Sequence, residues 1–467
     1  MTQKTRITLL LSLTFLFLVI SPLTIFYSLG WRIDWGNKRV IQSGIFYFKV
    51  LPKGTQVYVD GKMAKKTDFF FGSALIENLL PGKYEVEIRK DGFQPWKKVL
   101  EIKERSATEA KNIILLPEKT NFSILSKNVE EFFVSPDENK VILKEGNPNP
   151  EDKTASSWSL KLFDLEKGLK SHLFFEADLS KTENDVVSLN FSPDSKKIIL
   201  KADIKGVFKY YIFELDKSPV TLKSLDFSKP IPEEVYFNPS DYQKLLIFDS
   251  KTLKENSLTG DTLSSIILED IALFRIRETD IYYMDKSGLV FKTDGSFLRK
   301  EQLNTTPFII KEGESYEIYP SGPRLFIKNG AVLYNLNEEN KTFEILLESA
   351  DRLTLSADHK KIAYSNGYEI SVMFLDKKYD QPQKEEGEKM FVTRLSERID
   401  GLYWLTDHYL IFYAQNKIKV VEIDDRDKIN IFDLESPNIS DFFWNRVNKK
   451  ILILTEKDLH LSEKITP

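Results

Sequence analysis

The chain begins with one long apolar segment and then changes to short alternating runs. Residues Ile7 to Leu29 carry no charged side chain. At 1.5 Å per residue a helix of this length reaches roughly 34 Å, enough to cross a hydrocarbon core of about 30 Å. We therefore predict a short N-terminal tail (residues 1–6) and a transmembrane helix over residues 7–30, which contacts the lipid bilayer through residues 7–29.

A cleaved secretory signal is the alternative interpretation of this segment. Such a signal has a shorter apolar region of about 7–15 residues and then a small-x-small site, and no Ala-x-Ala pattern follows here. Lys4 and Arg6 precede the segment and Arg32, Lys38 and Arg39 follow it, so the positive-inside count is nearly tied. The short basic tail favours a cytoplasmic N-terminus with the bulk of a single-pass cell-membrane protein outside, and the reverse orientation stays open.

From Gly44 to Pro117 the pattern is one of short strands with a period of two. Ile45 to Val50 and Tyr84 to Ile88 alternate apolar and polar positions, and Asp-Gly and Pro-Gly turn signals separate such runs. We expect a small β-sandwich over residues 44–117, joined to the helix by a juxtamembrane linker of residues 31–43.

The strands and turns of this segment resemble a PEGA domain. The resemblance is carried by Pro52-x-Gly54, Val57-Tyr58-Val59-Asp60-Gly61, Leu79-x-Pro81-Gly82-x-Tyr84-x-Val86-x-Ile88 and Lys90-Asp91-Gly92-Phe93. The name-giving tetrad reads Pro52-Lys53-Gly54-Thr55, which departs from the family at its second and fourth positions. The resemblance implies a place outside the cytoplasm, a role in surface or carbohydrate interaction, and no catalytic residues.

Three consecutive phenylalanines, Phe69 to Phe71, follow Lys62, Lys65 and Lys66. Consecutive side chains of a strand point to opposite faces, so three adjacent Phe cannot all enter one core. We expect packing in the core or between domains, with contact to a partner or to lipid as the alternatives. Replacing Phe70 by Ser is expected to alter domain docking or membrane proximity.

Residues 118–467 repeat a pattern of strand, tight turn and strand, and such repeats decide the fold. The clearest copies cover residues 132–143, 189–200, 235–248 and 353–364, and weaker copies surround residues 277–283, 318–327, 402–413 and 442–454. Eight units average about 44 residues each and seven would average about 50, whereas propeller blades have about 40–45. We favour eight units, with seven as the rival.

The turns Ser135-Pro136-Asp137 and Ser192-Pro193-Asp194 resemble the PD40 repeat of TolB-like, WD40-like β-propellers, although Glu138 and Ser195 replace the Gly that follows the Asp in that repeat. The resemblance implies a β-propeller over residues 118–467. The last unit shows only three strands, so we expect the segment Phe122 to Leu125 to supply the fourth and remove the open edge. The predicted fold class is therefore all-β apart from one transmembrane helix.

The composition limits the kinds of functional site that the chain can contain. The 467 residues include no Cys, which excludes disulfides, thiolate metal sites and Cys nucleophiles. A net charge of −4 leaves no basic footprint, so no nucleic-acid partner is expected. The histidines His172, His359, His408 and His460 stand alone, and no Ser elbow or phosphate-binding Gly loop occurs. We predict no catalytic, cofactor-binding or metal-ligating residues and no cofactor.

Some aspartates and histidines could be interpreted as functional residues, but we favour structural roles for them. Asp137, Asp194 and Asp358 recur as calcium ligands would, but no further acid stands at fixed spacing, so we expect them to cap turns. His359 and His408 are expected to be solvated turn residues.

The tryptophans and the long polar insertions also have a favoured interpretation and an alternative. Trp158, Trp404 and Trp444 are expected in the core rather than as sugar-stacking platforms. The polar insertions 144–157 and 376–389 are expected to be solvated loops that serve as adaptable contact surfaces.

Together these features predict a membrane-anchored, extracytoplasmic binding or scaffolding protein of the cell envelope, whose propeller loops contact a protein or a cell-envelope glycan. A propeller hydrolase of the glycosidase or peptidase type stays open and would need carboxylates that converge at strand ends in the channel. An envelope-assembly or sensor subunit that acts only through protein contacts is the other alternative. The bacterial surface is implied by the family resemblance alone.

Overall fold

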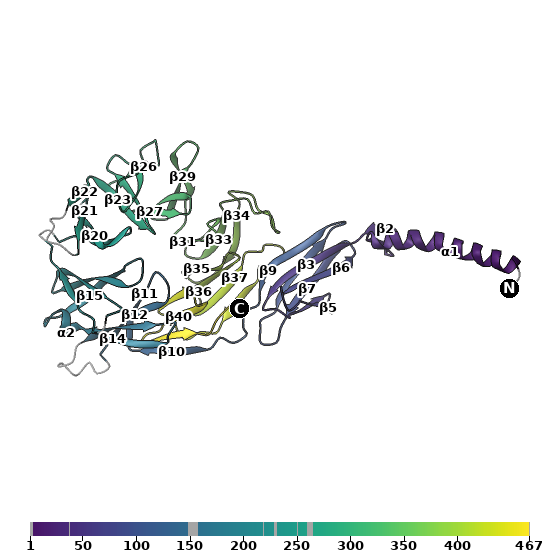
Figure 1. Cartoon of the computed structure of the whole chain (residues 1–467), viewed down its shortest axis with the longest axis horizontal. Helices are drawn as coiled ribbons and strands as arrows, with labels where there is room; N and C mark the ends of the chain where they lie inside the picture. Colours follow the sequence, from purple (N-terminus) through teal and green to yellow (C-terminus); the bar gives the residue numbers. More distant parts are fainter. Residues whose placement is uncertain are drawn as a thin grey trace.

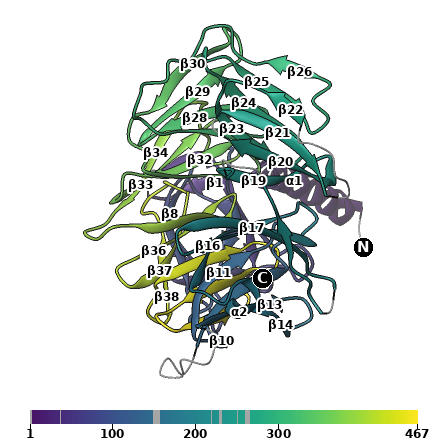
Figure 2. The same cartoon turned by 90° about the vertical axis from the view of Figure 1, so that its left-hand side faces the viewer.

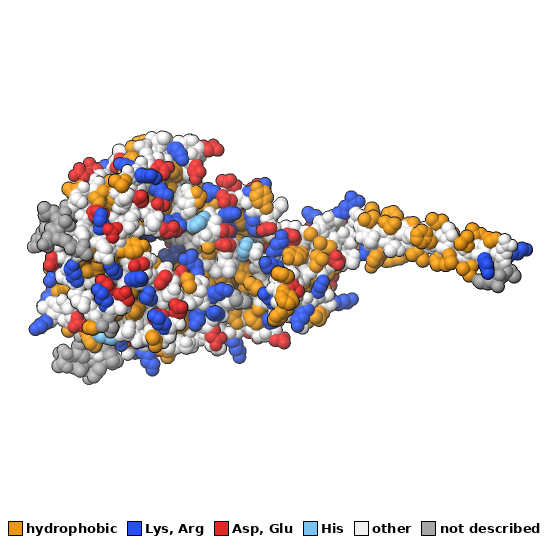
Figure 3. All heavy atoms as spheres, viewed as in Figure 1, with side chains coloured by type: hydrophobic (Ala, Val, Ile, Leu, Met, Phe, Trp, Pro, Cys, Tyr) orange, Lys and Arg blue, Asp and Glu red, His pale blue; other side chains and the backbone are white. Residues whose placement is uncertain are grey.

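One long helix is followed by β-structure along nearly all of the chain (Figure 1). The computed structural model describes residues 3–36, 38–147, 157–217, 219–227, 231–249, 251–258 and 265–466. Helix α1 (Gln3–Ser28) projects from one end of the molecule, none of its residues is buried, and hydrophobic side chains cover it (Figure 3). Its length and composition suffice to span a membrane, a test that a signal sequence also passes.

Residues 31–43, predicted as a juxtamembrane linker, contain regular structure. Strands β1 (Trp31–Asp34) and β2 (Arg39–Gln42) pair as a short hairpin. The guanidinium of Arg32 donates to the carbonyl oxygen of Tyr27 at 2.7 Å and also to Asn78 Oδ1 on the next sheet. The hairpin thus braces the end of α1, and four-residue strands are too short for their alternation to stand out in the sequence.

Two sheets pack face to face after the hairpin. Their orders are β6–β3–β9 and β5–β4–β7–β8. The strands are β3 (Gly44–Leu51), β4 (Gln56–Val59), β5 (Lys62–Lys66), β6 (Ser73–Leu79), β7 (Gly82–Arg89), β8 (Trp96–Ile102) and β9 (Ala107–Ile114). The expected alternation is clear in β3, where Phe46, Phe48 and Val50 are buried in the core between the sheets.

Phe69, Phe70 and Phe71 lie in the turn between β5 and β6 and not in a strand. Their side chains are 80%, 77% and 73% exposed. The expectation that they pack in the core or between domains is therefore wrong. The strand argument failed because a turn releases consecutive side chains from the two-residue alternation.

Eight four-stranded antiparallel sheets follow within the described residues (Figures 1 and 2). The first four are β11 (Val129–Val134), β12 (Lys140–Gly146), β13 (Trp158–Asp164) and β14 (Leu169–Phe175); β15 (Asn184–Phe191), β16 (Lys197–Ile204), β17 (Val207–Glu214) and β18 (Lys223–Leu225); β19 (Glu234–Asn238), β20 (Asp241–Asp249), β21 (Thr252–Ser257) and β22 (Ser265–Leu268); and β23 (Ile271–Arg277), β24 (Asp280–Asp285), β25 (Val290–Asp294) and β26 (Lys300–Gln302). Helix α2 (Glu176–Leu179) lies between the first two sheets.

The other four sheets continue in chain order. They are β27 (Tyr316–Ser321), β28 (Arg324–Asn329), β29 (Val332–Asn337) and β30 (Thr342–Leu347); β31 (Arg352–Leu355), β32 (Lys361–Ser365), β33 (Glu369–Phe374) and β34 (Lys389–Arg394); β35 (Asp400–Thr406), β36 (Tyr409–Ala414), β37 (Lys417–Glu422) and β38 (Ile431–Leu434); and β39 (Asp441–Asn445), β40 (Lys450–Leu454) and β41 (Asp458–Ser462), completed by β10 (Phe122–Lys127).

The chain closes on itself through β10. Phe122 pairs with Ser462 and Ser123 with Leu461, so the expectation that this segment supplies the fourth strand of the last unit is confirmed. An apolar cluster joins each sheet to the next. A further cluster, with Val141 from the first sheet and Leu452 from the last, completes the circle. The sheets therefore form a closed ring, the arrangement of a β-propeller.

The first strand of each sheet lies innermost, because first strands of neighbouring sheets contact one another, as β31 contacts β35 and β35 contacts β39. In an antiparallel sheet the turns after the first and third strands share one side. We call this side of the ring the proximal face, because its turn between β37 and β38 touches the sandwich. The opposite side, where the innermost strands begin, is the distal face.

The Asp residues of the repeated turns cap those turns, as predicted. Asp137 Oδ1 accepts a hydrogen bond from the Asn139 amide at 3.1 Å, and Asp194 and Asp358 make the equivalent bonds to Lys196 and Lys360 at 3.2 and 3.0 Å. Each of these aspartates also accepts from a Ser hydroxyl two residues earlier. This bonding fixes the same tight turn on three sheets.

The residue after each Asp adopts a left-handed conformation, with φ of 55° at Glu138, 58° at Ser195 and 57° at His359. All three side chains contact the preceding sheet. Glu138 Oε2 accepts from the Arg446 amide at 2.6 Å, Ser195 Oγ accepts from the Asp137 amide at 3.3 Å, and His359 Nδ1 lies 3.0 Å from Ser321 Oγ. These contacts link successive sheets on the proximal face.

Candidate functional site

The sandwich meets the ring at the seventh sheet, through a buried ion pair. Lys98 on β8 is fully buried, and its ammonium nitrogen lies 2.8 Å from Glu422 Oε1 at the end of β37. The same nitrogen lies 2.7–2.8 Å from the carbonyl oxygens of Asp424, Arg426 and Lys428 in the turn that follows. The charge is thus surrounded by acceptors from the ring, as a buried ammonium requires.

Glu422 is equally well held. Its carboxylate accepts hydrogen bonds from Trp96 Nε1 at 2.7 Å and from the Asn430 amide at 2.9 Å. Burial raises the pKa of Glu422, while Lys98 and these donors favour its charged form. Removing one partner of such a pair costs about 3–5 kcal/mol, so the contact holds the sandwich and the ring in one orientation.

The insertion 376–389 also binds the sandwich. Gln381 Nε2 donates to the Ala107 carbonyl at 2.9 Å, and Gln381 Oε1 accepts from the Glu109 amide at 3.0 Å. β9 is an edge strand, so this side chain satisfies backbone groups that a further strand would otherwise pair. Most side chains of residues 376–389 are exposed, as predicted for a solvated loop, and the surface that the loop contacts is the chain's own sandwich. In the other insertion, Lys144 to Gly146 belong to β12, and Lys144 and Glu145 are buried, so the loop predicted there begins too early. Residues 148–156 lie outside the described part of the chain.

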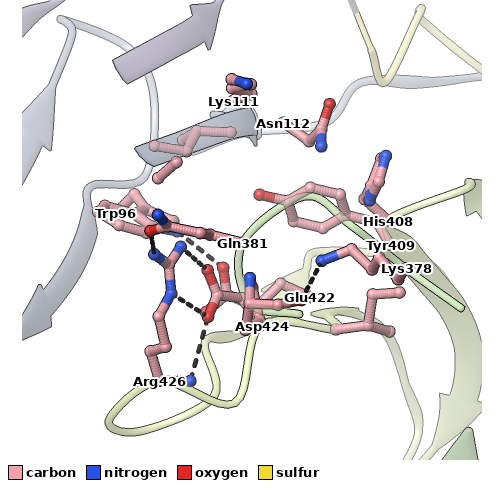
Figure 4. A pocket seen from close by; sticks show the side chains of 14 residues that line it. Trp96, Lys111, Asn112, Lys378, Gln381, His408, Tyr409, Glu422, Asp424 and Arg426 are labelled. Atoms are coloured by element: carbon pink, nitrogen blue, oxygen red, sulfur yellow. Dashed lines mark hydrogen bonds and ion pairs between the residues drawn. The ribbon is translucent and has the colours of Figure 1, made fainter. Parts of the chain in front are cut away.

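A cavity of about 40 Å³ remains at the centre of this junction (Figure 4). It suits water and not a substrate. Burial lowers the pKa of Lys378 to about 8 and, with Lys361 and Lys378 nearby, that of His408 to about 4. His408 lies in the turn between β35 and β36, but it is half-buried here and not solvated, so that expectation is corrected; the same correction applies to His359, which Ser321 holds.

The tryptophans and the remaining histidines singled out in the sequence lie on strands of the ring. Trp158, Trp404 and Trp444 are 4%, 5% and 3% exposed, which confirms that they are core residues. Trp404 and Trp444 line the wall of a cavity of about 470 Å³ at the proximal mouth of the ring's channel. The ring of His172 on β14 contacts that of Phe175, with the centroids 4.1 Å apart and the planes tilted by 40°. His460 lies on β41.

An acidic residue lies near the start of the innermost strand in six of the eight sheets, on the distal side of the ring. These residues are Glu131, Asp185, Glu234, Glu317, Asp400 and Asp441. Loss of solvation raises the pKa of Glu131, with Asp185 and Asp441 acting in the same direction, and loss of solvation likewise raises the pKa of Asp441. Lys144 Nζ lies 2.6 Å from Asp185 and 3.1 Å from Glu130. Asp185 and Asp441, on the two sheets adjacent to that of Glu131, thus influence its carboxyl group electrostatically, and all three side chains are exposed.

The sequence did not reveal this recurring position of carboxylates on the distal side. The signal was an acidic residue near the start of the first strand in six repeats, visible only when the repeats are aligned on their turns. Among the described residues no group of three or more His, Cys, Asp or Glu side chains is arranged to hold a metal ion.

Comparisons with known proteins identify no family. No protein-family model and no curated protein matches the chain. Among solved structures it is similar to a eukaryotic initiation factor (13% identity, TM-score 0.47, 75% of this chain and 89% of that one) and to Saccharomyces cerevisiae Sqt1 (12%, 0.44, 75% and 98%). It is also similar to Kluyveromyces lactis Hsv2p (10%, 0.40, 66% and 97%). At these TM-scores the similarities carry no argument about function, and the resemblance to PEGA and PD40 sequences rests on the residues alone.

Proposed function

We propose that the chain is a membrane-anchored, extracytoplasmic scaffold. In this proposal residues 7–30 span the bilayer, residues 31–43 brace the helix, a PEGA-like sandwich of residues 44–117 acts as a spacer, and an eight-bladed TolB-like propeller of residues 118–467 meets a protein or cell-envelope glycan. The N-terminus is cytoplasmic. The observation that carries the proposal is the junction, because the Lys98–Glu422 pair fixes the ring relative to the anchor.

The junction also determines which side of the ring is free. The sandwich occupies the proximal face at the sixth and seventh sheets, through the turn that follows Glu422 and through Gln381. The distal face points away from the sandwich and carries the carboxylates described above. Loops on a rigid framework commonly form binding surfaces, so the distal face is the proposed partner surface.

A co-purification experiment tests this function. Tagged full-length chain is extracted from its own membranes in mild detergent, and we expect a stoichiometric partner. Exchanging Asp185→Lys and Asp441→Lys on the distal face should remove that partner. The matched exchange of two exposed carboxylates on the proximal face, Glu166→Lys with Asp216→Lys, should not. Equal recovery with both variants would contradict the assignment of the distal face.

A hydrolase is the second candidate, because Glu131, Asp185 and Asp441 lie near the distal ends of the innermost strands of three adjacent sheets. Partial loss of solvation raises the pKa of Glu131, the direction that a general acid needs, while its side chain stays exposed to solvent. Purified full-length chain is assayed against glycan and peptide substrates, together with Glu131→Gln. Turnover that Glu131→Gln abolishes would establish the hydrolase, and absence of turnover alongside a stoichiometric partner would establish the scaffold.

A further inference from the structure

Phe69, Phe70 and Phe71 form the most conspicuous apolar feature of the sandwich surface. All three side chains are more than 70% exposed, although exposing an aromatic ring to water is unfavourable. Phe69 and Phe70 contact each other edge to face, with ring centroids 6.2 Å apart. No other described segment outside α1 exposes three consecutive large apolar side chains. Contiguous exposed apolar surface of this kind marks interaction sites.

The turn that carries these rings is held in one shape. Asp68 Oδ1 accepts from the amides of Phe70 and Phe71 at 2.9 and 2.6 Å, and Oδ2 accepts from the Ser73 amide at 2.7 Å. The Ser73 hydroxyl also donates to Oδ2, and this bond, with those from the amides, keeps the pKa of Asp68 well below its usual range. A loop that is already ordered pays little conformational entropy when it binds.

Glycine and lysine complete this framework. Gly72 has a φ of +70°, and a Cβ there would stand 2.4 Å from the Val50 carbonyl oxygen, so the turn requires Gly. Lys53 Nζ donates to the Phe70 carbonyl at 2.7 Å. The aromatic side chains are thus presented by a backbone tied down at both ends.

The surroundings of the turn are basic. Lys49 pairs with Ser73 at one end of the turn, Lys66 precedes Thr67 at the other, and Lys53 binds its middle. Lys49, Lys53 and Lys66 are all exposed. The carboxylate of Asp68 is turned toward the turn's own amides. The apolar tip with a basic border therefore complements an apolar groove bordered by carboxylates.

The position of the turn favours a protein over the bilayer. α1 joins the sandwich at the Gly44 end of β3, whereas the turn lies beside Val50, whose amide donates to the Gly72 carbonyl at 2.9 Å. Six residues of strand separate these ends by roughly 20 Å. The contacts of Arg32 with Tyr27 and Asn78 hold the helix on the sandwich, and transmembrane helices tilt by about 20° on average, too little to bring the turn to the headgroups.

We infer that Phe69, Phe70 and Phe71 are a docking element for a second protein at the same membrane, one that offers an apolar groove bordered by carboxylates about 20 Å from the bilayer. The inference rests on the proposed membrane anchoring. It adds a contact surface on the sandwich that is independent of the distal face of the ring.

Site-specific photo-cross-linking in native membranes tests this inference. A photoreactive amino acid is placed at position 70 of the tagged full-length chain, and at Leu298, which is 87% exposed on the ring, as the control. We expect an adduct with one protein at position 70 and none with that protein at position 298. The captured protein is then purified, and its affinity for the full-length chain is measured.

The affinity measurement decides between docking and mere proximity. Because aromatic anchors dominate interfaces, Phe70→Ser with Phe71→Ser should weaken binding about 100-fold. Lys49→Glu with Lys66→Glu should weaken it about 10-fold and reduce its dependence on salt. Unchanged melting temperature verifies that these exposed substitutions leave the fold intact.

Several outcomes would overturn the inference: adducts with lipid only, adducts with a second copy of this chain only, the same adduct at position 298, no adduct, or an affinity that the Phe variants leave unchanged. If the proposed membrane anchoring is wrong, a separate extraction experiment shows it. Alkaline carbonate would then release the full-length chain from membranes, whatever is cross-linked at position 70.

Discussion

The residues that replace Gly in the repeated turns show how a local cost is offset by contacts across the fold. A non-Gly residue in the left-handed region costs roughly 1 kcal/mol. Glu138 recovers this cost through charge-assisted bonds to the Arg446 amide and guanidinium, while Ser195 gains a single long bond. The sequence showed the substitution but not its reason, because Glu138 and Arg446 are far apart along the chain.

This difference predicts opposite effects of two similar substitutions. Glu138→Gly relaxes the backbone but removes bonds to a charged group, so the free energy of unfolding should fall by about 1–2 kcal/mol. Ser195→Gly gives the same relaxation and should leave stability unchanged or higher. The melting temperatures of the two variants are compared. If Glu138→Gly stabilised the chain, the bonds between Glu138 and Arg446 would not offset the cost of the left-handed backbone.

His408 predicts how stability depends on pH. Its pKa is about 4 in the folded chain, below its ordinary value of 6.5, so the unfolded chain binds the proton first. The stability contributed by neutral His408 is therefore complete above pH 6.5 and declines as the pH falls toward 4. The melting-temperature difference between wild type and His408→Gln should shrink between pH 7.5 and pH 4.5; a constant difference would contradict the buried, neutral imidazole.

At the scale of elements, local pattern predicted strands well and contacts between them poorly. The eight repeated units of the sequence coincide with the first two strands of the eight sheets, because the turn chemistry of Ser-Pro-Asp and the two-residue alternation are local signals. The hairpin β1–β2, the exposed Phe turn and the docking of insertion 376–389 on the sandwich were not predicted. The hairpin and the insertion have partners distant in sequence, Asn78 for Arg32 and β9 for Gln381. The Phe turn is set by the local bonds of Asp68, which the strand argument overlooked.

The closing strand is the element on which the ring depends. Deleting residues 458–467 removes β41, the partner of β10, and opens the ring between the last and first sheets. We expect a loss of at least about 3 kcal/mol and a broader melt, since apolar contacts such as those of Leu459 are lost as well. Glu301→Pro, in the exposed outer strand β26, is the control: it removes one hydrogen bond to β25 but leaves the ring closed, so it should cost only about 1 kcal/mol.

The junction pair makes a second prediction for elements. Lys98→Met leaves the Glu422 carboxylate buried without its counter-ion and should cost about 3–5 kcal/mol. Adding Glu422→Gln removes the unpaired charge and should restore part of the loss. In differential scanning calorimetry we expect the sandwich and the ring to melt together in the wild type and separately in Lys98→Met. A single variant as stable as the wild type would show that the pair contributes nothing.

At the scale of the whole molecule, the sequence predicted the parts and their order but not their arrangement. Composition and periodicity could indicate a helix, a sandwich and a repeat array. That the ring is fixed to the sandwich follows from Lys98 and Glu422, more than three hundred positions apart, and from Gln381 on β9. The distal carboxylates likewise could not be recognised as a group from the sequence, because only the folded ring places the starts of their strands on one side.

The claim that the ring lies outside the cell on a membrane anchor has one direct test. The chain has no Cys, so a single introduced thiol is labelled uniquely. Leu298→Cys lies on the exposed surface of the ring, and Lys4→Cys lies at the start of α1. A membrane-impermeant maleimide applied to intact cells should label Leu298→Cys, and should label Lys4→Cys only after lysis. The reverse pattern, or labelling of neither thiol before lysis, would contradict the account.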